Sequence, residues 1–332
     1  MLAEPSPYPS FATDNPDYPM KTFRPVLAFL ATLALAAAAQ AAPKSVLVVT
    51  TTTGFRHSSI EVAEKVIAQL GEQSGAFTVD YARVTPPSVP RKPNAPKATG
   101  DEKKDSAAKK RYDEELAKYQ ADEPRIKDLT KKYADDQKRV LAEKMSAEAL
   151  KKYDAIIFAN TTGDLPLPDR EAFIKWVESG KGFCAMHSGS DTFHGFRPYV
   201  EMLGGEFRTH GPQVTVTAVN KAPQHPATKH LPARWEIFDE IYEFKSHEQG
   251  GVKELLSMDQ HPHTKAPGYN GMSWYRNVGK GRVFYTSLGH REDMWDPAWK
   301  DGGGNRKNPP AIALAYQQHI LGGIKWALGL EK

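Results

Sequence analysis

Short apolar runs alternate with amphipathic stretches along the first part of the chain. Residues 46–50 (VLVVT) form a β-branched apolar run, which is typical of a strand buried on both faces. Residues 60–70 carry apolar side chains at helical spacing, and residues 77–81 alternate as a half-buried strand does. A strand, a helix and a second strand in this order predict an α/β fold with a parallel sheet and helices on its faces.

The same pattern returns after residue 150. Residues 155–159 (AIIFA) are a continuous apolar run and predict another buried strand. Further strands are expected at 183–186, 214–219 and 281–286, and helices at 169–179 and 312–328. These elements predict one α/β domain that extends over residues 42–332.

A charged segment interrupts this pattern between the two halves. Residues 86–96 are rich in proline, and residues 101–143 are dominated by Lys, Asp and Glu. We interpret residues 87–143 as an insertion that forms a charged helical hairpin, with Pro124 near its turn. The insertion is either a solvated excursion from the domain or an arm that docks on a partner.

The N-terminus has the three parts of a secretory signal. A basic start after Met20 leads into an apolar run at 26–39 and then into an A-x-A site that ends at Ala41. The run is too short and too rich in alanine for a membrane span, which needs about 20 residues. We therefore expect a signal peptide at 20–41, a non-native extension at 1–19, and an exported protein that is periplasmic or extracellular and has no stable membrane span after cleavage.

Composition excludes several other classes of function. The formal charge is +4 over 332 residues, and no stripe of Lys and Arg is interleaved with aromatics, so we expect no nucleic-acid partner. Cys184 is the single cysteine, so the exported chain has no internal disulfide. No nucleotide cofactor is expected.

Histidines follow three of the predicted strands. In open parallel sheets, ligands bind outside the carboxyl ends of the strands. His57 follows the first strand, His187 follows the strand at 183–186, and His290 follows the strand at 281–286. Because histidine accounts for only 11 of 332 residues, this placement predicts a histidine-rich site at one edge of the sheet.

Residues 185–189 (AMHSG) have the small-x-x-x-Gly pattern of a strand-to-helix elbow, with His187 at its tip. A class I glutamine amidotransferase places cysteine at that point. An alternative register puts Cys184 at the tip, but it lacks the second glycine and leaves almost no strand before the turn. Cys184 is expected as a buried, inert thiol, which argues against amidotransferase chemistry.

Several ordered motifs resemble the ThuA-like (trehalose utilisation) family. They are GFRH at 54–57, MHSGSDT at 186–192, GGEFRTH at 204–210, HP at 225–226 with DEIY at 239–242, and GKGRVFYTSLGH at 279–290. The resemblance covers about 44–86 and 145–329, and the charged insertion departs from it. It implies a class I glutamine amidotransferase-like, flavodoxin-like fold, with a mostly parallel sheet and helices on both faces, that lacks the amidotransferase cysteine. It also implies work on sugars, notably 3-keto-glycosides made by partner oxidoreductases.

These observations together predict the members of the site. They are His187, Asp191 and Glu240 as catalytic groups, Arg56, Asp164, Ser188 and Trp295 as substrate-binding groups, and His57, His210 and His290 as metal ligands or, alternatively, oxyanion stabilisers. His187 is assigned as the base and Asp191 as the group that orients it. Arg56 is expected to hold a carboxylate or sugar hydroxyls, or to pair with Asp191. His210 and Glu240 also fit an exposed turn and a solvated acidic stretch.

Two chemical uses of the cluster are open. Imidazoles and carboxylates can bind a divalent metal such as Zn²⁺, for which three protein ligands and an open position are the catalytic arrangement. A histidine can also act as a general base near neutral pH. The predicted activity is cleavage of the glycosidic bond of a 3-keto sugar, by elimination or hydrolysis. The alternatives are a non-catalytic sugar-binding module and an assembly protein that uses the charged arm.

Overall fold

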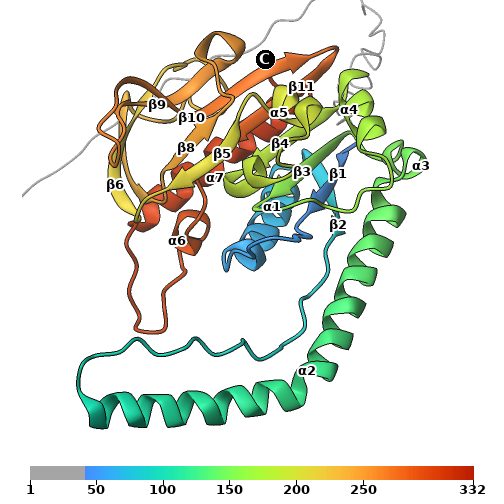
Figure 1. Cartoon of the computed structure of the whole chain (residues 1–332). Coiled ribbons are helices and arrows are strands. Elements are labelled where there is room, and N and C mark those ends of the chain that lie inside the picture. The colour runs from blue at the N-terminus through green and yellow to red at the C-terminus, as the bar shows by residue number, and fades with distance from the viewer. Residues whose placement is uncertain (1–41) are drawn as a thin grey trace, which may run out of the picture. The chain divides into compact units, whose positions relative to one another are not determined.

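Nine strands form one sheet. The computed structural model describes residues 42–332 (Figure 1), so the extension expected at 1–19 and the signal peptide expected at 20–41 lie outside the described residues. The strands, in the order of the sheet, are β2 (Phe77–Ala82), β1 (Lys44–Val49), β3 (Ala155–Ala159), β4 (Gly182–Met186), β11 (Gly281–Thr286), β10 (Pro267–Val278), β9 (Lys253–Gln260), β6 (Val214–Asn220) and β7 (Arg234–Asp239). A separate pair of strands joins β5 (Glu206–His210) to β8 (Tyr242–Lys245).

The first five strands of this order are parallel. The chain adds β2 on one side of β1 and then adds β3, β4 and β11 on the other side. This is the strand order of a flavodoxin-like sheet, so the predicted fold class is confirmed. The side on which the chain adds successive strands changes between β1 and β3, although the strands themselves stay parallel. Ligands bind beside such a switch point, at the carboxyl ends of the strands.

The remaining four strands are antiparallel and extend the sheet beyond β11. Only two residues, Gly279 and Lys280, separate β10 from β11. A two-residue connection can join only antiparallel strands, since parallel neighbours need a long crossover. The sheet is therefore mixed, and the expectation of a mostly parallel sheet holds for the half that carries the strand-end histidines.

Helices cover both faces of the parallel half because successive residues of its strands point to opposite sides. Val46 and Val48 of β1 face one apolar cluster, which includes α1 (Ile60–Ser74) and α7 (Pro310–Ala327). Leu47 and Val49 face a second cluster. The helices of that second cluster are α3 (Ala147–Leu150), α4 (Arg170–Glu178), α5 (Arg197–Leu203) and the end of α2.

The charged insertion is one helix, α2 (Glu102–Met145), so the predicted hairpin is wrong. Pro124 lies inside the helix, and Figure 1 shows a bend near the middle. An interior proline removes one backbone hydrogen bond and kinks a helix without having to end it. Opposite charges pair along the helix at i, i+4 spacing, as in Lys109–Asp113 and Lys131–Asp135, and these pairs lie on its exposed face.

The second half of α2 is part of the domain. Every buried residue of this helix lies after Pro124, and Leu141 and Met145 are fully buried in the cluster that covers the sheet. Lys144 also forms an ion pair with Asp80 of β2 at 2.9 Å. The insertion therefore includes a docked segment as well as a solvated one. Within residues 42–332, no helix has the length and apolar character needed to cross a membrane.

Replacement of Leu141 by Ala tests this division of α2. We expect Leu141→Ala to lower the free energy of unfolding by about 2–5 kcal/mol, because it removes a buried side chain and leaves a cavity. The matched variant Leu116→Ala, at a half-buried position in the mostly exposed first part of the helix, is expected to cost less than about 1 kcal/mol. Urea titration measures both changes. Equal losses would contradict a docked second half.

Candidate functional site

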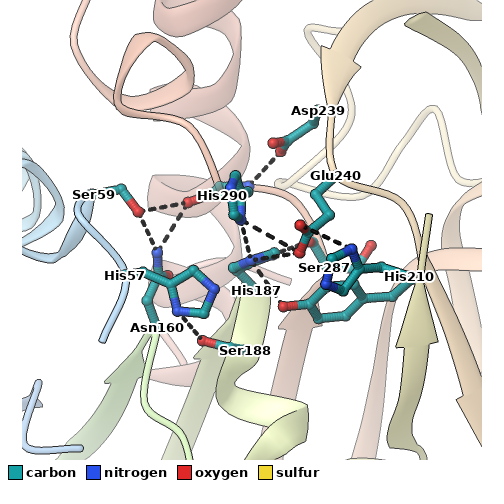
Figure 2. Close-up of polar contacts among 12 residues, drawn as sticks. His57, Ser59, Asn160, His187, Ser188, His210, Asp239, Glu240, Ser287 and His290 are labelled. Atoms are coloured by element: carbon teal, nitrogen blue, oxygen red, sulfur yellow. Dashed lines mark hydrogen bonds and ion pairs between the residues drawn. The ribbon is translucent and has the colours of Figure 1, made fainter. Parts of the chain in front are cut away.

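Four polar side chains converge at the carboxyl edge of the parallel strands (Figure 2). His57 follows β1, His187 follows β4, His290 follows β11, and Glu240 lies between β7 and β8. Each of the four offers one ligand atom, and these atoms all lie within 4.8 Å of one another. The strand-end rule thus brings the three predicted histidines together, and Glu240 joins them from the antiparallel part of the sheet.

His187 occupies a strained turn. Its φ of 46° is in the left-handed region, which non-glycine residues rarely adopt. A Cβ at Gly189 would lie 2.7 Å from the Cβ of Ala185, so the turn closes only because residue 189 has no side chain. The hydroxyl of Tyr285 donates to the carbonyl of His187 at 2.8 Å and holds the turn. Cys184 lies in the middle of β4, fully buried, as predicted, and burial raises the pKa of its thiol.

The hydrogen bonds of His187 determine its tautomer. Nδ1 lies 2.9 Å from the carbonyl oxygen of Ser287, and a carbonyl only accepts, so Nδ1 carries the proton. Nε2 then bears the lone pair and accepts from the Tyr242 hydroxyl at 2.8 Å. Burial, together with the neighbouring His57 and His290 rings, lowers the pKa of His187 well below its ordinary value. His187 is therefore a neutral imidazole whose lone pair points into the cluster.

His290 and Glu240 complete a close triangle with His187. Nδ1 of His290 lies 3.1 Å from Nε2 of His187 and 3.4 Å from Oε1 of Glu240. The third side, from His187 Nε2 to Glu240 Oε1, is 3.7 Å. Burial alone would lower the pKa of His290, but the carboxylates of Glu240, Asp239 and Glu292 together outweigh burial and raise it. These carboxylates therefore favour positive charge at this point of the cluster.

His57 lies beside this triangle. Its ring centroid is 4.7 Å from that of His187 and 5.3 Å from that of His290. Its Nδ1 contacts the Ser188 hydroxyl at 3.2 Å, and Figure 2 shows the other ring nitrogen on the side that faces His187. Burial, with His290 and His210 nearby, lowers the pKa of His57 to about 3. His57 is thus held neutral, as a metal ligand must be.

His210, expected as a metal ligand, lies at the mouth of the site instead. It is on β5, and 45 % of its side chain is exposed. Its Nδ1 lies 3.0 Å from Oε2 of Glu240 and 2.9 Å from the carbonyl oxygen of Gly211. Both partners are acceptors, so Nδ1 carries a proton and Nε2 is the nitrogen left for other contacts. The two carboxylate oxygens of Glu240 thus face different histidines.

Asp191 and Ser188 have different contacts from those expected. The carboxylate of Asp191, expected to orient His187, forms an ion pair with His194. The Ser287 carbonyl orients the His187 ring instead. Ser188, expected to bind substrate, is fully buried, and its hydroxyl contacts His57.

Two other predicted substrate-binding residues are engaged near the surface. Arg56 pairs with Glu61 at 2.9 Å and donates to the Thr50 carbonyl at 3.3 Å, so the proposed pairing with Asp191 is wrong. The exposed carboxylate of Asp164 lies 3.5 Å from Arg170. The described contacts of neither residue reach the histidine cluster.

Trp295 is a core residue, so its side chain cannot contact a substrate as predicted. Its side chain is fully buried on α6 (Glu292–Trp295), and its ring packs edge-on against Tyr316 of α7. Its Nε1 donates to the carbonyl of Gly289 at 2.8 Å. Trp295 therefore acts on the site through the backbone that precedes His290.

Sequence reasoning missed several residues that hold this backbone. Asn160 Nδ2 donates to the Gly289 carbonyl at 2.9 Å, and the Gly289 amide donates to Asp239 Oδ2 at 2.7 Å. Burial raises the pKa of Asp239 to about 6. Asp239 and Tyr242 are the first and last residues of the DEIY motif, and Asn160 directly follows β3. Their positions, at the ends of a family motif and directly after a strand, were the sequence signals that could have identified them as site residues.

The triangle fits a divalent transition metal. With Zn–N distances of about 2.0–2.1 Å, neighbouring ligand atoms of a tetrahedral site lie about 3.3 Å apart. The three observed separations are 3.1, 3.4 and 3.7 Å. Two imidazoles and a carboxylate suit zinc and the neighbouring first-row transition metals. The ring nitrogen of a ligand histidine that does not bind the metal usually donates to a carbonyl or carboxylate, as Nδ1 of His187 does here. His187, His290 and Glu240 could hold the ion. His57, predicted as a ligand, offers a fourth ligand atom within 4.8 Å of the other three.

Comparisons with known proteins agree with this architecture. The family model described as ThuA, trehalose utilisation, matches residues 109–301, a span that includes His187, His210, Glu240 and His290. Crystal structures of ThuA-like proteins from Parabacteroides merdae and Bacteroides uniformis share the fold. The Parabacteroides merdae protein is 17 % identical, with a TM-score of 0.54, and the match covers 86 % of this chain and 90 % of that protein. The Bacteroides uniformis protein is 18 % identical, with a TM-score of 0.53, and the match covers 88 % of this chain and 94 % of that protein.

No curated protein matches the sequence. The family model covers more than half of the chain, and its description agrees with the motifs that surround the cluster. The chain belongs to the ThuA (trehalose utilisation) family.

Proposed function

We propose that this protein is a metal-dependent enzyme that cleaves the glycosidic bond of oxidised sugars, namely 3-keto-glycosides. The observation that carries the proposal is the position of Glu240. One of its oxygens belongs to the triangle that fits a metal, and the other lies 3.0 Å from Nδ1 of the exposed His210. A metal-binding group and a proton-transfer group are thereby joined through one carboxylate. The family description, trehalose utilisation, supports a sugar as the substrate class.

His210 is the proposed general base. Glu240 and the Gly211 carbonyl engage its Nδ1, which leaves the lone pair of the neutral ring on Nε2. A histidine that a carboxylate orients in this way is the usual arrangement of a base in hydrolytic enzymes. The sequence assigned this role to His187. That ring is fully buried, and its Nδ1 donates to the Ser287 carbonyl, which is the usual arrangement of a metal-ligand histidine, so it suits a ligand better.

A divalent ion held by His187, His290 and Glu240 would act as a Lewis acid and stabilise negative charge on the ketone oxygen of the substrate. The ketone at C3 makes the neighbouring C2 proton acidic. Nε2 of His210 takes this proton, and the electrons of the C2–H bond move to the C3 oxygen. When they return, the bond from C1 to the glycosidic oxygen breaks, and His210 returns the proton to the departing oxygen. Addition of water to the C1–C2 double bond would complete hydrolysis.

The proposed setting is outside the cytoplasm, in the periplasm or the medium. The sequence at 20–41 supports this placement, because it has the basic, apolar and A-x-A parts of a secretory signal. A sugar oxidoreductase would have to supply the 3-keto group of the substrate. N-terminal sequencing of the protein from cell fractions tests the export. We expect a mature chain that begins at Ala42 outside the cytoplasm; a cytoplasmic chain that keeps residues 20–41 would contradict it.

Metal content tests the ligand assignment. We expect about one divalent ion per chain in the purified protein, since the three donors suit a single tetrahedral site. His187→Ala and His290→Ala should each lose the ion, because each removes one ligand. Elemental analysis of dialysed protein measures it. The control is His230→Ala, since His230 contacts the carbonyl of Ala315. Equal metal content in all four proteins, or none in any of them, would contradict the assignment.

Replacement of His210 separates proton transfer from metal binding. We expect His210→Gln to lower kcat on a 3-keto-glycoside by about 10²–10⁴-fold, the usual contribution of a general base, and to keep its metal. Glu240→Gln should lose both metal and activity, because Glu240 serves both histidines. Release of the aglycone measures turnover. Full activity in His210→Gln would contradict the assigned base, and a wild-type protein that binds but never cleaves the sugar would be a binding module.

A further inference from the structure

Phe55 is an exposed aromatic residue next to the histidine cluster. Three large apolar side chains are exposed in residues 42–332, namely Phe55, Leu314 and Leu330, and Phe55 is the most exposed at 68 %. The ring centroid of Phe55 is 4.9 Å from that of His57, and the two rings meet edge to face. Since His57 lies 4.7 Å from His187, a single ring separates Phe55 from the core of the site.

The backbone that carries Phe55 is held firmly. Thr162, in the loop after β3, donates from its hydroxyl to the Phe55 carbonyl at 2.7 Å. The Thr162 carbonyl accepts from the amides of Thr53 at 3.1 Å and Gly54 at 3.3 Å. Gly163 has a φ of 78°, and a Cβ there would lie 2.6 Å from the Thr53 hydroxyl. The two loops thus interlock, and the exposed ring projects from a backbone with little freedom.

Helix α2 also supports this loop. Nε2 of Gln137, a buried residue of α2, donates to the Thr52 carbonyl at 2.7 Å. A single exposed apolar side chain is common on protein surfaces and by itself indicates nothing. Here the ring is both fixed in place and adjacent to the cluster. A platform whose backbone is already ordered loses little conformational entropy when it binds a ligand.

We propose that Phe55 is a stacking platform for the apolar face of a pyranose ring at the mouth of the site. One face of a pyranose presents C–H groups, which suit the negative face of an aromatic ring, and its hydroxyls remain free for polar partners. Phe55 would thus select ring-form sugars and present them to the cluster, a role that the buried Trp295 cannot perform. The choice of a sugar as the ligand rests on the proposed function.

Sugar titration of the metal-loaded full chain tests the platform. The probe is methyl β-D-glucopyranoside, and the acyclic polyol sorbitol is the control ligand; saturation-transfer NMR measures both dissociation constants. We expect Phe55→Ala to weaken pyranoside binding roughly tenfold and to leave sorbitol unchanged, because only the ring offers an apolar face. Phe55→Trp should retain the affinity. Leu314→Ala, which removes an exposed apolar side chain on α7, should change neither constant.

Three results would overturn the platform. They are no measurable binding of the pyranoside to the wild type, equal affinity in wild type and Phe55→Ala, and an equal loss for sorbitol. Turnover of methyl 3-keto-β-D-glucopyranoside, measured separately, distinguishes failure of the platform from failure of the proposed function. Pyranoside binding that depends on Phe55 without turnover would uphold the platform and refute cleavage. If the wild type turns over the keto-glycoside and Phe55→Ala binds the pyranoside as tightly as the wild type does, the platform alone is refuted.

Discussion

The hydrogen bond from Nδ1 of His187 to the Ser287 carbonyl is the contact on which the rest of the site depends. It fixes the tautomer, and so it directs the Nε2 lone pair toward His290, Glu240 and the Tyr242 hydroxyl. The bond links the ends of β4 and β11, which are neighbours in the parallel half of the sheet. Its geometry therefore depends on the register of these strands and on the strained φ of His187. The fold positions the chemistry through the backbone.

Core packing and site geometry are coupled at Gly289. Its amide and carbonyl are held by Asp239, Asn160 and the indole of Trp295. Trp295 in turn packs against Tyr316 of α7, so a helix on one face of the sheet helps to position His290. Glu240 arrives from the antiparallel extension, next to Asp239 of β7. A cluster assembled from both halves of the sheet can form only when the whole sheet is in place.

The parts of the fold and site that could be predicted follow from local periodicity and one topological rule. Apolar runs, and alternation in β2, located the five parallel strands, and the position after three of them located His57, His187 and His290. The remaining features depend on tertiary contacts that local patterns do not encode. Trp295 lies in a short polar segment that resembles an exposed loop, yet it is buried against α7. The charged insertion resembled a hairpin because a proline usually ends a helix, whereas Pro124 only bends α2.

The most direct measurement of the metal triangle is anomalous diffraction at the zinc absorption edge from a crystal grown with zinc. We expect one strong peak about 2.0–2.2 Å from His187 Nε2, His290 Nδ1 and a Glu240 carboxylate oxygen. His210 should remain outside the coordination shell, with its Nδ1 near the second oxygen of Glu240. A zinc peak coordinated by other residues would contradict the assignment. So would a crystal saturated with zinc that shows no peak at the carboxyl ends of β4 and β11.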